Sequence, residues 1–211
     1  MLQDVNLATQ VAQCTSCRLA VDRGGLSVPA SSGSFYQPGG LALFLEAPGA
    51  EEEKLHTSLS NGAQIGKPLV GRSGTFMDQL LLIAGINREE ILVLNRIRCR
   101  PPRNRIDDYP DAVAQCDEWV KKELALYDPA VVICCGNTAL RSIFEPSASI
   151  TAFRGILRST PKEHPYGARV FSATFHPAYA LRNGGLKSQQ AVDIVKDIKT
   201  AMSLLWAKYT I

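Results

Sequence analysis

The sequence predicts an α/β fold: a three-layer α/β/α sandwich around a central four-stranded, mainly parallel sheet. Four short apolar runs alternate with longer segments of helical periodicity, and they cover 41–45, 91–94, 130–134 and 169–173. Near-continuous apolar runs of this length are typical of strands that are buried on both faces, as in a parallel sheet. Right-handed crossovers would then place helices on both faces.

Helical patterns lie between and after these strands. Segment 74–83 is apolar at most positions, and segment 111–126 begins with acidic residues that suit a helix N-terminus. Asn137 is interpreted as the cap of a short helix. The clearest pattern is the last one, whose apolar residues recur every three or four positions and predict one buried helical stripe. The stripe consists of Ala191, Ile194, Val195, Ile198, Met202 and Leu205.

The length and composition indicate a single globular domain over residues 1–211. The chain is 45% hydrophobic and 20% charged with both signs interspersed, a composition that disfavours disorder. A net charge of +3 permits an anionic partner but does not require one. No apolar run reaches the roughly 20 residues of a membrane span, and the N-terminus lacks a secretory pattern. We therefore expect a cytoplasmic monomer.

Segments 24–40 and 51–66 are predicted to be long loops.

Six cysteines in a reducing compartment favour metal ligation or burial over disulfides. Cys14 and Cys17 form a C-x2-C pair, and Cys99 and Cys116 form a wider second pair. Spacing alone leaves three possibilities open: two buried cysteines beside an incidental C-x2-C, a zinc site, or an iron–sulfur cluster. The wide second pair favours iron–sulfur. The adjacent cysteines at 134–135 end a strand and are expected in the core or at its edge.

Residues 95–105 read NRIRCRPPRNR, with five arginines in eleven positions. A charge run of this kind is often a solvated surface loop. However, arginine rather than lysine dominates here, and the arginine fork suits phosphate oxygens. We therefore interpret this arginine run as a nucleic-acid-binding edge.

Three further features follow the ends of predicted strands, where α/β sheets place ligands. They are the LEAPG turn at 45–49, Asn95 itself, and HPAYALRN at 176–183. A glycine-rich turn, GKPLVGRSG at 66–74, leads into a helix whose free N–H groups could hold a phosphate. Each feature alone is weak, but together they indicate one site at one edge of the sheet.

The ordered motifs EAPGAEE, GKPLVGRSG, NRIRCRPPRNR and HPAYALRN resemble those of family 4 uracil-DNA glycosylases. The resemblance runs from Cys14 to Asn183. It implies an enzyme that hydrolyses the N-glycosidic bond of uracil in single- or double-stranded DNA, after the nucleotide is flipped out of the helix. It also implies a [4Fe-4S] cluster, with Cys14, Cys17, Cys99 and Cys116 as its ligands.

The same resemblance assigns the site residues. Glu46 would act on the attacking water and the positive charge on the sugar, and His176 would hydrogen-bond uracil O2. Asn95 would pair with uracil N3–H and O4, a pattern that cytosine reverses. Ala47 and Leu69 would contact the base. The residues expected to bind DNA are Lys67, Arg72, Ser73, Arg100, Arg103, Tyr179 and Arg182.

Four departures from the family pattern bear on the substrate. Leu45 stands where glycine is usual, and Leu69 replaces a phenylalanine that stacks on the base. The spacer 53–66 is longer than the family's and is expected to border the base pocket. Tyr179 and Ala180 replace a small residue and a leucine, so Tyr179 or Leu181 would wedge the DNA. Three alternatives follow: another base specificity, a DNA-binding relative without catalysis, or an unrelated α/β protein with a zinc site.

Overall fold

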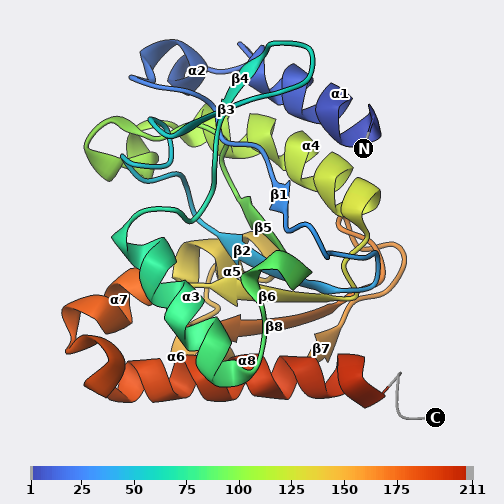
Figure 1. The fold of residues 1–211 in the computed structure, drawn as a ribbon, viewed down its shortest axis with the longest axis vertical. Coiled ribbons are helices and arrows are strands. Elements are labelled where there is room, and N and C mark those ends of the chain that lie inside the picture. The colour runs from blue at the N-terminus through green and yellow to red at the C-terminus, as the bar shows by residue number, and fades with distance from the viewer. Residues whose placement is uncertain (1, 208–211) are drawn as a thin grey trace.

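A computed structural model describes residues 2–207 and confirms the predicted α/β class (Figure 1). The four expected strands are β2 (Leu41–Leu45), β5 (Ile91–Asn95), β6 (Val131–Cys135) and β8 (Val170–Thr174). They lie side by side in the order β5-β2-β6-β8, and every neighbouring pair is parallel. The four apolar runs thus form the centre of the sheet, with boundaries within one residue of those expected.

Two very short strands extend the sheet to six, beyond the four that were predicted. β1 (Ser31–Ser32) pairs antiparallel with β5, and β7 (Arg158–Ser159) pairs antiparallel with β8. Each has two residues and neither is buried, so neither carries the apolar pattern that marks the central strands. β1 arises from segment 24–40, which was predicted to be loop only.

Alternate residues of the central strands face two separate apolar cores. In β2, Leu41, Leu43 and Leu45 face one core, and Ala42 and Phe44 face the other. The first core is covered by α3 (Arg72–Ala84), α7 (Pro177–Arg182) and α8 (Gln189–Ala207). The second is covered by α4 (Pro110–Tyr127), α5 (Asn137–Ile143) and α6 (Ile150–Phe153). Figure 1 shows α8 below the sheet and α4 above it, which confirms the three layers.

The helices follow the sequence patterns closely. The stripe predicted for α8 faces the first core, and four of its residues, among them Ile194 and Ile198, are buried. One cap differs from the prediction: Gly136 is the residue before α5, and Asn137 is already helical. The Asn137 side chain instead accepts a hydrogen bond from Ile150 N over 2.9 Å, tying α5 to α6. No helix in residues 2–207 is long and apolar enough to cross a bilayer.

The long segment after β2 forms a hairpin that sequence patterns missed. β3 (His56–Ser58) pairs antiparallel with β4 (Gln64–Gly66), and the hairpin packs beside α1 (Leu2–Ala12). Asn61 Nδ2 donates to Thr9 Oγ1 over 2.7 Å. Short helical turns complete the described chain: α2 (Arg18–Asp22), η1 (Arg88–Glu90), η2 (Pro102–Asn104), η3 (Ile106–Asp108) and η4 (Gly185–Lys187).

Candidate active site

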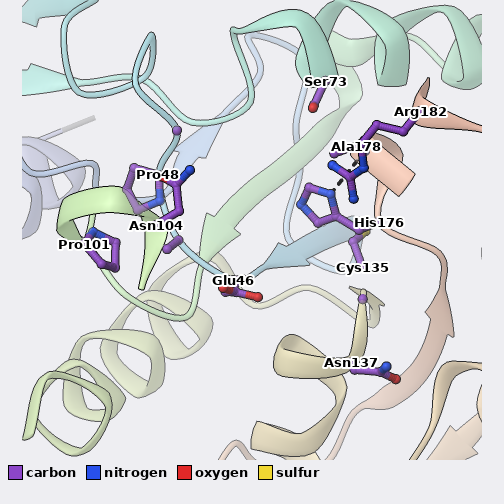
Figure 2. Close-up of a pocket in the computed structure, with 13 residues that line it drawn as sticks. Glu46, Pro48, Ser73, Pro101, Asn104, Cys135, Asn137, His176, Ala178 and Arg182 are labelled. Atoms are coloured by element: carbon purple, nitrogen blue, oxygen red, sulfur yellow. Dashed lines mark hydrogen bonds between the residues drawn. The ribbon is translucent and has the colours of Figure 1, made fainter. Parts of the chain in front are cut away.

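The strand order creates a switch point at β2, where parallel sheets open a ligand crevice. From β2 the chain passes to β5 on one side and then to β6 on the other. A cavity of about 540 Å³ lies at the carboxyl ends of β2, β6 and β8 (Figure 2). It is lined by Glu46, Ala47, Pro48, Gly49, Ser73, Pro101, Asn104, Cys135, Gly136, Asn137, His176, Ala178 and Arg182. No residue from 54 to 65 lines this cavity, so the longer spacer does not border it as expected.

Glu46 and His176 come together in this cavity although 130 positions separate them. Glu46 directly follows β2, and His176 lies two residues beyond β8. Parallel strands end at one edge, so residues just past their carboxyl ends converge. Figure 2 shows the Glu46 carboxylate and the His176 ring on adjoining sides of the cavity. Ala47, predicted to contact the base, lies beside Glu46 in the same wall.

The surroundings of His176 hold its ring neutral and fix its tautomer. Burial, assisted by the nearby charge of Arg182, lowers the pKa of His176 from 6.5 to about 4. The Ala178 N–H donates to His176 Nδ1 over 3.2 Å. A backbone N–H can only donate, so Nδ1 carries no proton and the ring proton is on Nε2. No described residue forms a hydrogen bond with Nε2, so this N–H is available to a ligand.

Asn95 lies next to the cavity but does not line it. Asn95 is 2% exposed and pairs in register with Leu45 on β2. Its Nδ2 is buried and makes no hydrogen bond of standard geometry within residues 2–207, although the Asn95 amide interacts with the Glu52 carboxylate. A buried amide without a well-formed hydrogen bond is costly, so it indicates a donor that a ligand would satisfy. The structure thus brings Asn95 close to Glu46 at the neighbouring ends of β5 and β2, but Asn95 is buried and is not part of the cavity lining.

Glu52 is a half-buried acid that interacts with Asn95, and no sequence pattern indicated it. Its carboxylate accepts a hydrogen bond from Gly49 N over 3.2 Å. Burial raises the pKa of Glu52, and nearby groups, including the Asn95 amide and Arg88, oppose the rise. The only sequence signal is the acidic run 51–53, which lies in a segment whose composition predicts a loop. Asn104 and Asn137 in the cavity wall were also missed.

Leu69 lies outside the Glu46–His176 cavity, contrary to the expectation that it contacts the base there. It is 3% exposed, belongs to the first core, and has a left-handed backbone with φ 57°. A Cβ on Gly74 would meet Leu69 O at 2.0 Å, so α3 packs tightly on the Leu69 backbone. Leu69 instead lines a second cavity of about 360 Å³ with Lys67 and Arg88. Lys67 therefore also lies away from the first cavity.

The arginine run does not form one uniform basic edge. Arg98 is fully buried, Arg100 pairs with Glu53 over 2.9 Å, and Arg105 pairs with Asp108 over 3.2 Å. Arg103 is exposed and has no ion pair within the described residues. Its loop carries Pro101 and Asn104 to the cavity, so Arg103 is the arginine of the run most available to a phosphate.

Other residues predicted to bind DNA lie around the cavity mouth. Ser73 and Arg182 line the cavity, and Arg72 is exposed at the first position of α3. Tyr179 is 41% exposed on α7, whereas Ala180 is buried and Leu181 packs on the first core. Of the two candidate wedge residues, Tyr179 is therefore the more exposed.

Three of the four predicted cysteine ligands meet in one apolar cluster. Cys99 and Cys116 are 4% exposed and pack with partly buried Cys17 and with Ala47 of the cavity wall. Burial raises the pKa of Cys99, and the nearby Cys17 and Cys14 raise it further, while Arg23 lowers it. Arg23 Nη1 donates to Cys99 Sγ over 3.2 Å. Cys134 and Cys135 are buried at the end of β6, as expected.

These cysteines are not grouped around a single point. In residues 2–207, no three His, Cys, Asp or Glu side chains could hold one metal ion together. A cubane places each thiolate on a different iron, so its sulfurs stand farther apart than the ligands of one ion. Four thiolate donors suit either zinc or a cubane, and three of the four cysteines lie together in this apolar cluster.

The parallel sheet and the cavity at its switch point define an α/β protein with a ligand site at its strand ends. The chain belongs to the uracil DNA glycosylase superfamily, whose family model matches residues 41–199. It is 32% identical over 200 residues to a type-4 uracil-DNA glycosylase of Thermotoga maritima, covering 94% of this chain and 93% of that protein.

Two further relatives carry the same name. The type-4 uracil-DNA glycosylase of Saccharolobus solfataricus is 30% identical, over 93% of this chain and 85% of that protein. That of Sulfurisphaera tokodaii is 29% identical, over 89% of this chain and 80% of that protein. The similarity therefore extends over nearly the whole of both chains.

Proposed function

We propose that this protein excises uracil from DNA by hydrolysing its N-glycosidic bond. The superfamily assignment and the names of the relatives support this function. The observation that carries it is the convergence of Glu46 and a neutral His176 in one cavity. A flipped nucleotide would bring its glycosidic bond between these two side chains.

Each of the two side chains suits one half of the reaction. As the bond breaks, the sugar gains positive charge and uracil leaves as an anion. Glu46 would stabilise the sugar cation and orient the attacking water. The His176 Nε2–H would donate to uracil O2, where the negative charge develops, and a neutral donor avoids transferring a full proton to the base.

Asn95 would select the base. Its amide offers one acceptor and two donors, which match N3–H and O4 of uracil. The buried Nδ2 lacks a hydrogen bond of standard geometry, which supports this role because uracil O4 would accept one from it.

DNA would approach across the cavity mouth. The start of α3, with Arg72 and Ser73, offers free backbone N–H groups to a phosphate. Arg103 and Arg182 would add charge on two further sides, and Tyr179 would fill the space that the flipped nucleotide leaves. Arg100, already paired with Glu53, would contribute less.

Cys14, Cys17, Cys99 and Cys116 would hold a [4Fe-4S] cluster. The cluster would supply a rigid cross-link between segments that are distant in sequence, since base hydrolysis moves no electrons. Cys99 directly follows Arg98 in the turn after β5, and Cys116 lies on α4. The cluster would thus join the segment between α1 and α2 to the turn after β5 and to α4.

Another base specificity is the second candidate. Leu69 offers no aromatic face and lies in the core instead of the cavity wall, so the stacking partner expected for uracil is missing. A catalytically inactive DNA-binding relative is less well supported, because Glu46 and His176 retain a shared cavity.

Analysis of the reaction products tests the proposal. Wild-type protein should release free uracil from a uracil oligonucleotide and leave an intact strand that alkali then breaks. Glu46→Gln should bind the same oligonucleotide but release little uracil, because the amide cannot stabilise a cation. Glu51→Gln, an exposed acid outside the cavity, is the matched control. Strand cleavage without alkali, or equal activity of Glu46→Gln, would contradict the proposal.

A further inference from the structure

Arg98 and Glu123 form an ion pair that is buried completely. Both side chains are 1% exposed; Arg98 Nε donates to Glu123 Oε1 over 3.1 Å, and Arg98 Nη2 donates to Glu123 Oε2. Glu123 also accepts a hydrogen bond from Ala30 N over 2.9 Å. Replacing a buried ion pair with apolar residues of similar volume is often neutral or stabilising. The stability of the core alone therefore does not explain this pair.

The remaining guanidinium nitrogen of Arg98, Nη1, contacts Asn95, the residue proposed to select the base. Arg98 Nη1 donates to the backbone oxygen of Asn95. A planar guanidinium can hold a carboxylate and a carbonyl in fixed relative positions, which the single ammonium of lysine cannot do. The Asn95 backbone is thus anchored to α4 through the side chains of Arg98 and Glu123.

The turn from Asn95 to Arg98 is also hydrogen-bonded to the segment that carries Glu46. Arg96 N donates to Leu45 O over 2.8 Å, and Ile97 N donates to Glu46 O over 3.1 Å. The turn from Asn95 to Arg98 therefore holds the Glu46 backbone on one side and the Asn95 backbone on the other. A shift of Arg98 would move both residues.

Arg98 and Glu123 lie on the same two segments as the buried cysteines Cys99 and Cys116. Cys99 directly follows Arg98, and Cys116 precedes Glu123 by seven residues, about two helical turns, on the same face of α4. Both cysteines are 4% exposed. Whatever fixes these cysteines relative to each other also fixes Arg98 relative to Glu123.

We propose that the Arg98–Glu123 pair is a positioning device for base recognition. It sets the orientation of the Asn95 amide and the position of the Glu46 backbone relative to Asn95. The inference rests on the proposed function, since it names what positions the base-reading residue. It predicts that the pair governs binding of the base more than binding of the DNA backbone. Arg98 and Glu123 are positioning residues, because neither lines the cavity.

Arg98→Lys tests this device, with Arg105→Lys as the matched control from the same run. Lysine keeps the charge but loses the fork, so one of the three hydrogen bonds to Glu123 and Asn95 must fail. Loss of such a bond should raise the inhibition constant of free uracil roughly 3- to 10-fold. Affinity for an oligonucleotide without uracil should not change. Arg105 pairs with exposed Asp108, so its replacement should leave both values unchanged.

Hydrogen exchange supplies a readout that does not depend on catalysis. In Arg98→Lys, the amides of Arg96 and Ile97 should exchange roughly 3- to 10-fold faster, because the turn is less firmly held. Amides of Leu92 and Val93 in the middle of β5 should keep their protection. A folded Arg98→Lys protein with wild-type exchange at Arg96 and Ile97 and wild-type uracil inhibition would overturn the inference.

A second variant covers the case in which Arg98→Lys does not fold. Arg98→Met combined with Glu123→Leu removes both buried charges and should fold. It should show the same loss of uracil inhibition and of protection at Ile97. Failure of both variants to fold would assign the pair to stability and overturn the inference. If wild-type protein releases and binds no uracil, the proposed function fails, and the exchange measurement still decides whether Arg98 positions the turn.

Discussion

His176 accepts a hydrogen bond from the backbone N–H of Ala178 through Nδ1, over 3.2 Å. This bond and the burial of the ring leave a neutral imidazole with its proton on Nε2. An imidazole in this state is a hydrogen-bond donor for a leaving anion and is not a general acid at neutral pH.

The titration of His176 should therefore lie far below that of an exposed histidine. Its pKa is lowered to about 4, so the ring should stay neutral from neutral pH down to about pH 5. Because the unfolded chain binds this proton at higher pH than the folded one, the contribution to stability is complete above about 6.5 and falls as the pH drops toward about 4. Nitrogen chemical shifts of the ring measure both tautomer and pKa. An imidazolium signal at pH 6 would contradict the assignment.

Removing the His176 ring should slow the chemical step. His176→Ala should raise the barrier by about 3–4 kcal/mol if Nε2–H acts as an oxyanion donor. Single-turnover release of uracil measures this step separately from DNA binding. His56→Ala, on the exposed β3–β4 hairpin, should behave as wild type. Equal single-turnover rates for His176→Ala and His56→Ala would exclude the proposed role.

Arg103 should carry more of the salt dependence of DNA binding than Arg100. Each arginine that neutralises a phosphate contributes about −0.7 to −0.9 to the slope of log K against log salt. Arg103→Ala should flatten the slope by about this amount, whereas Arg100→Ala should change it less because Glu53 already pairs with Arg100. Binding titrations over a range of salt concentrations give both slopes. If neither variant changes the slope, neither arginine neutralises a phosphate, and the arginine run has only a structural role.

Leu69→Phe distinguishes the two candidate base specificities. An aromatic ring at this position should raise uracil excision if the base pocket is a weakened form of the family's. Leu69 is buried with φ 57°, so Leu69→Met is the control for repacking without an aromatic face. Rates on uracil and hypoxanthine oligonucleotides compare the two. A folded Leu69→Phe protein that loses activity on its preferred base would show that the pocket serves another base.

The purified protein should contain about four irons and four sulfides per chain, as a cubane requires. Cys99→Ser should lose iron and brown colour, and it should lose solubility and DNA binding before any specific catalytic function. Cys134→Ala, a buried cysteine outside the cysteine cluster, should retain the iron. Stoichiometric zinc without iron in anaerobically prepared protein would contradict the assignment.

Two kinds of feature could be predicted from the sequence. They are the elements with periodically spaced apolar residues and the site residues that directly follow parallel strands. The four central strands and the α8 stripe are apolar at the spacing their structure requires. Glu46 and His176 were expected to meet because both follow strands of one parallel sheet. The assignments of a single domain, a monomer and a cytoplasmic location stay predictions.

The features that sequence patterns missed depend on tertiary contacts. Arg98 looks like a surface charge in its run, and only the folded chain shows Glu123 beside it. Leu69 takes a left-handed backbone that its residue type disfavours, and its carbonyl lies against Gly74 of α3. The two-residue edge strands and the β3–β4 hairpin carry no apolar alternation, so no local pattern marks them.

The most direct test of the central claim is excision from matched oligonucleotides that carry uracil, thymine, cytosine, hypoxanthine or xanthine at one position, followed by alkali. We expect strand breakage at uracil, none at cytosine, and loss of breakage when Glu46→Gln and His176→Ala are combined. Breakage at no base, or breakage that survives the double replacement, would contradict the claim that the Glu46–His176 cavity cleaves the glycosidic bond of uracil.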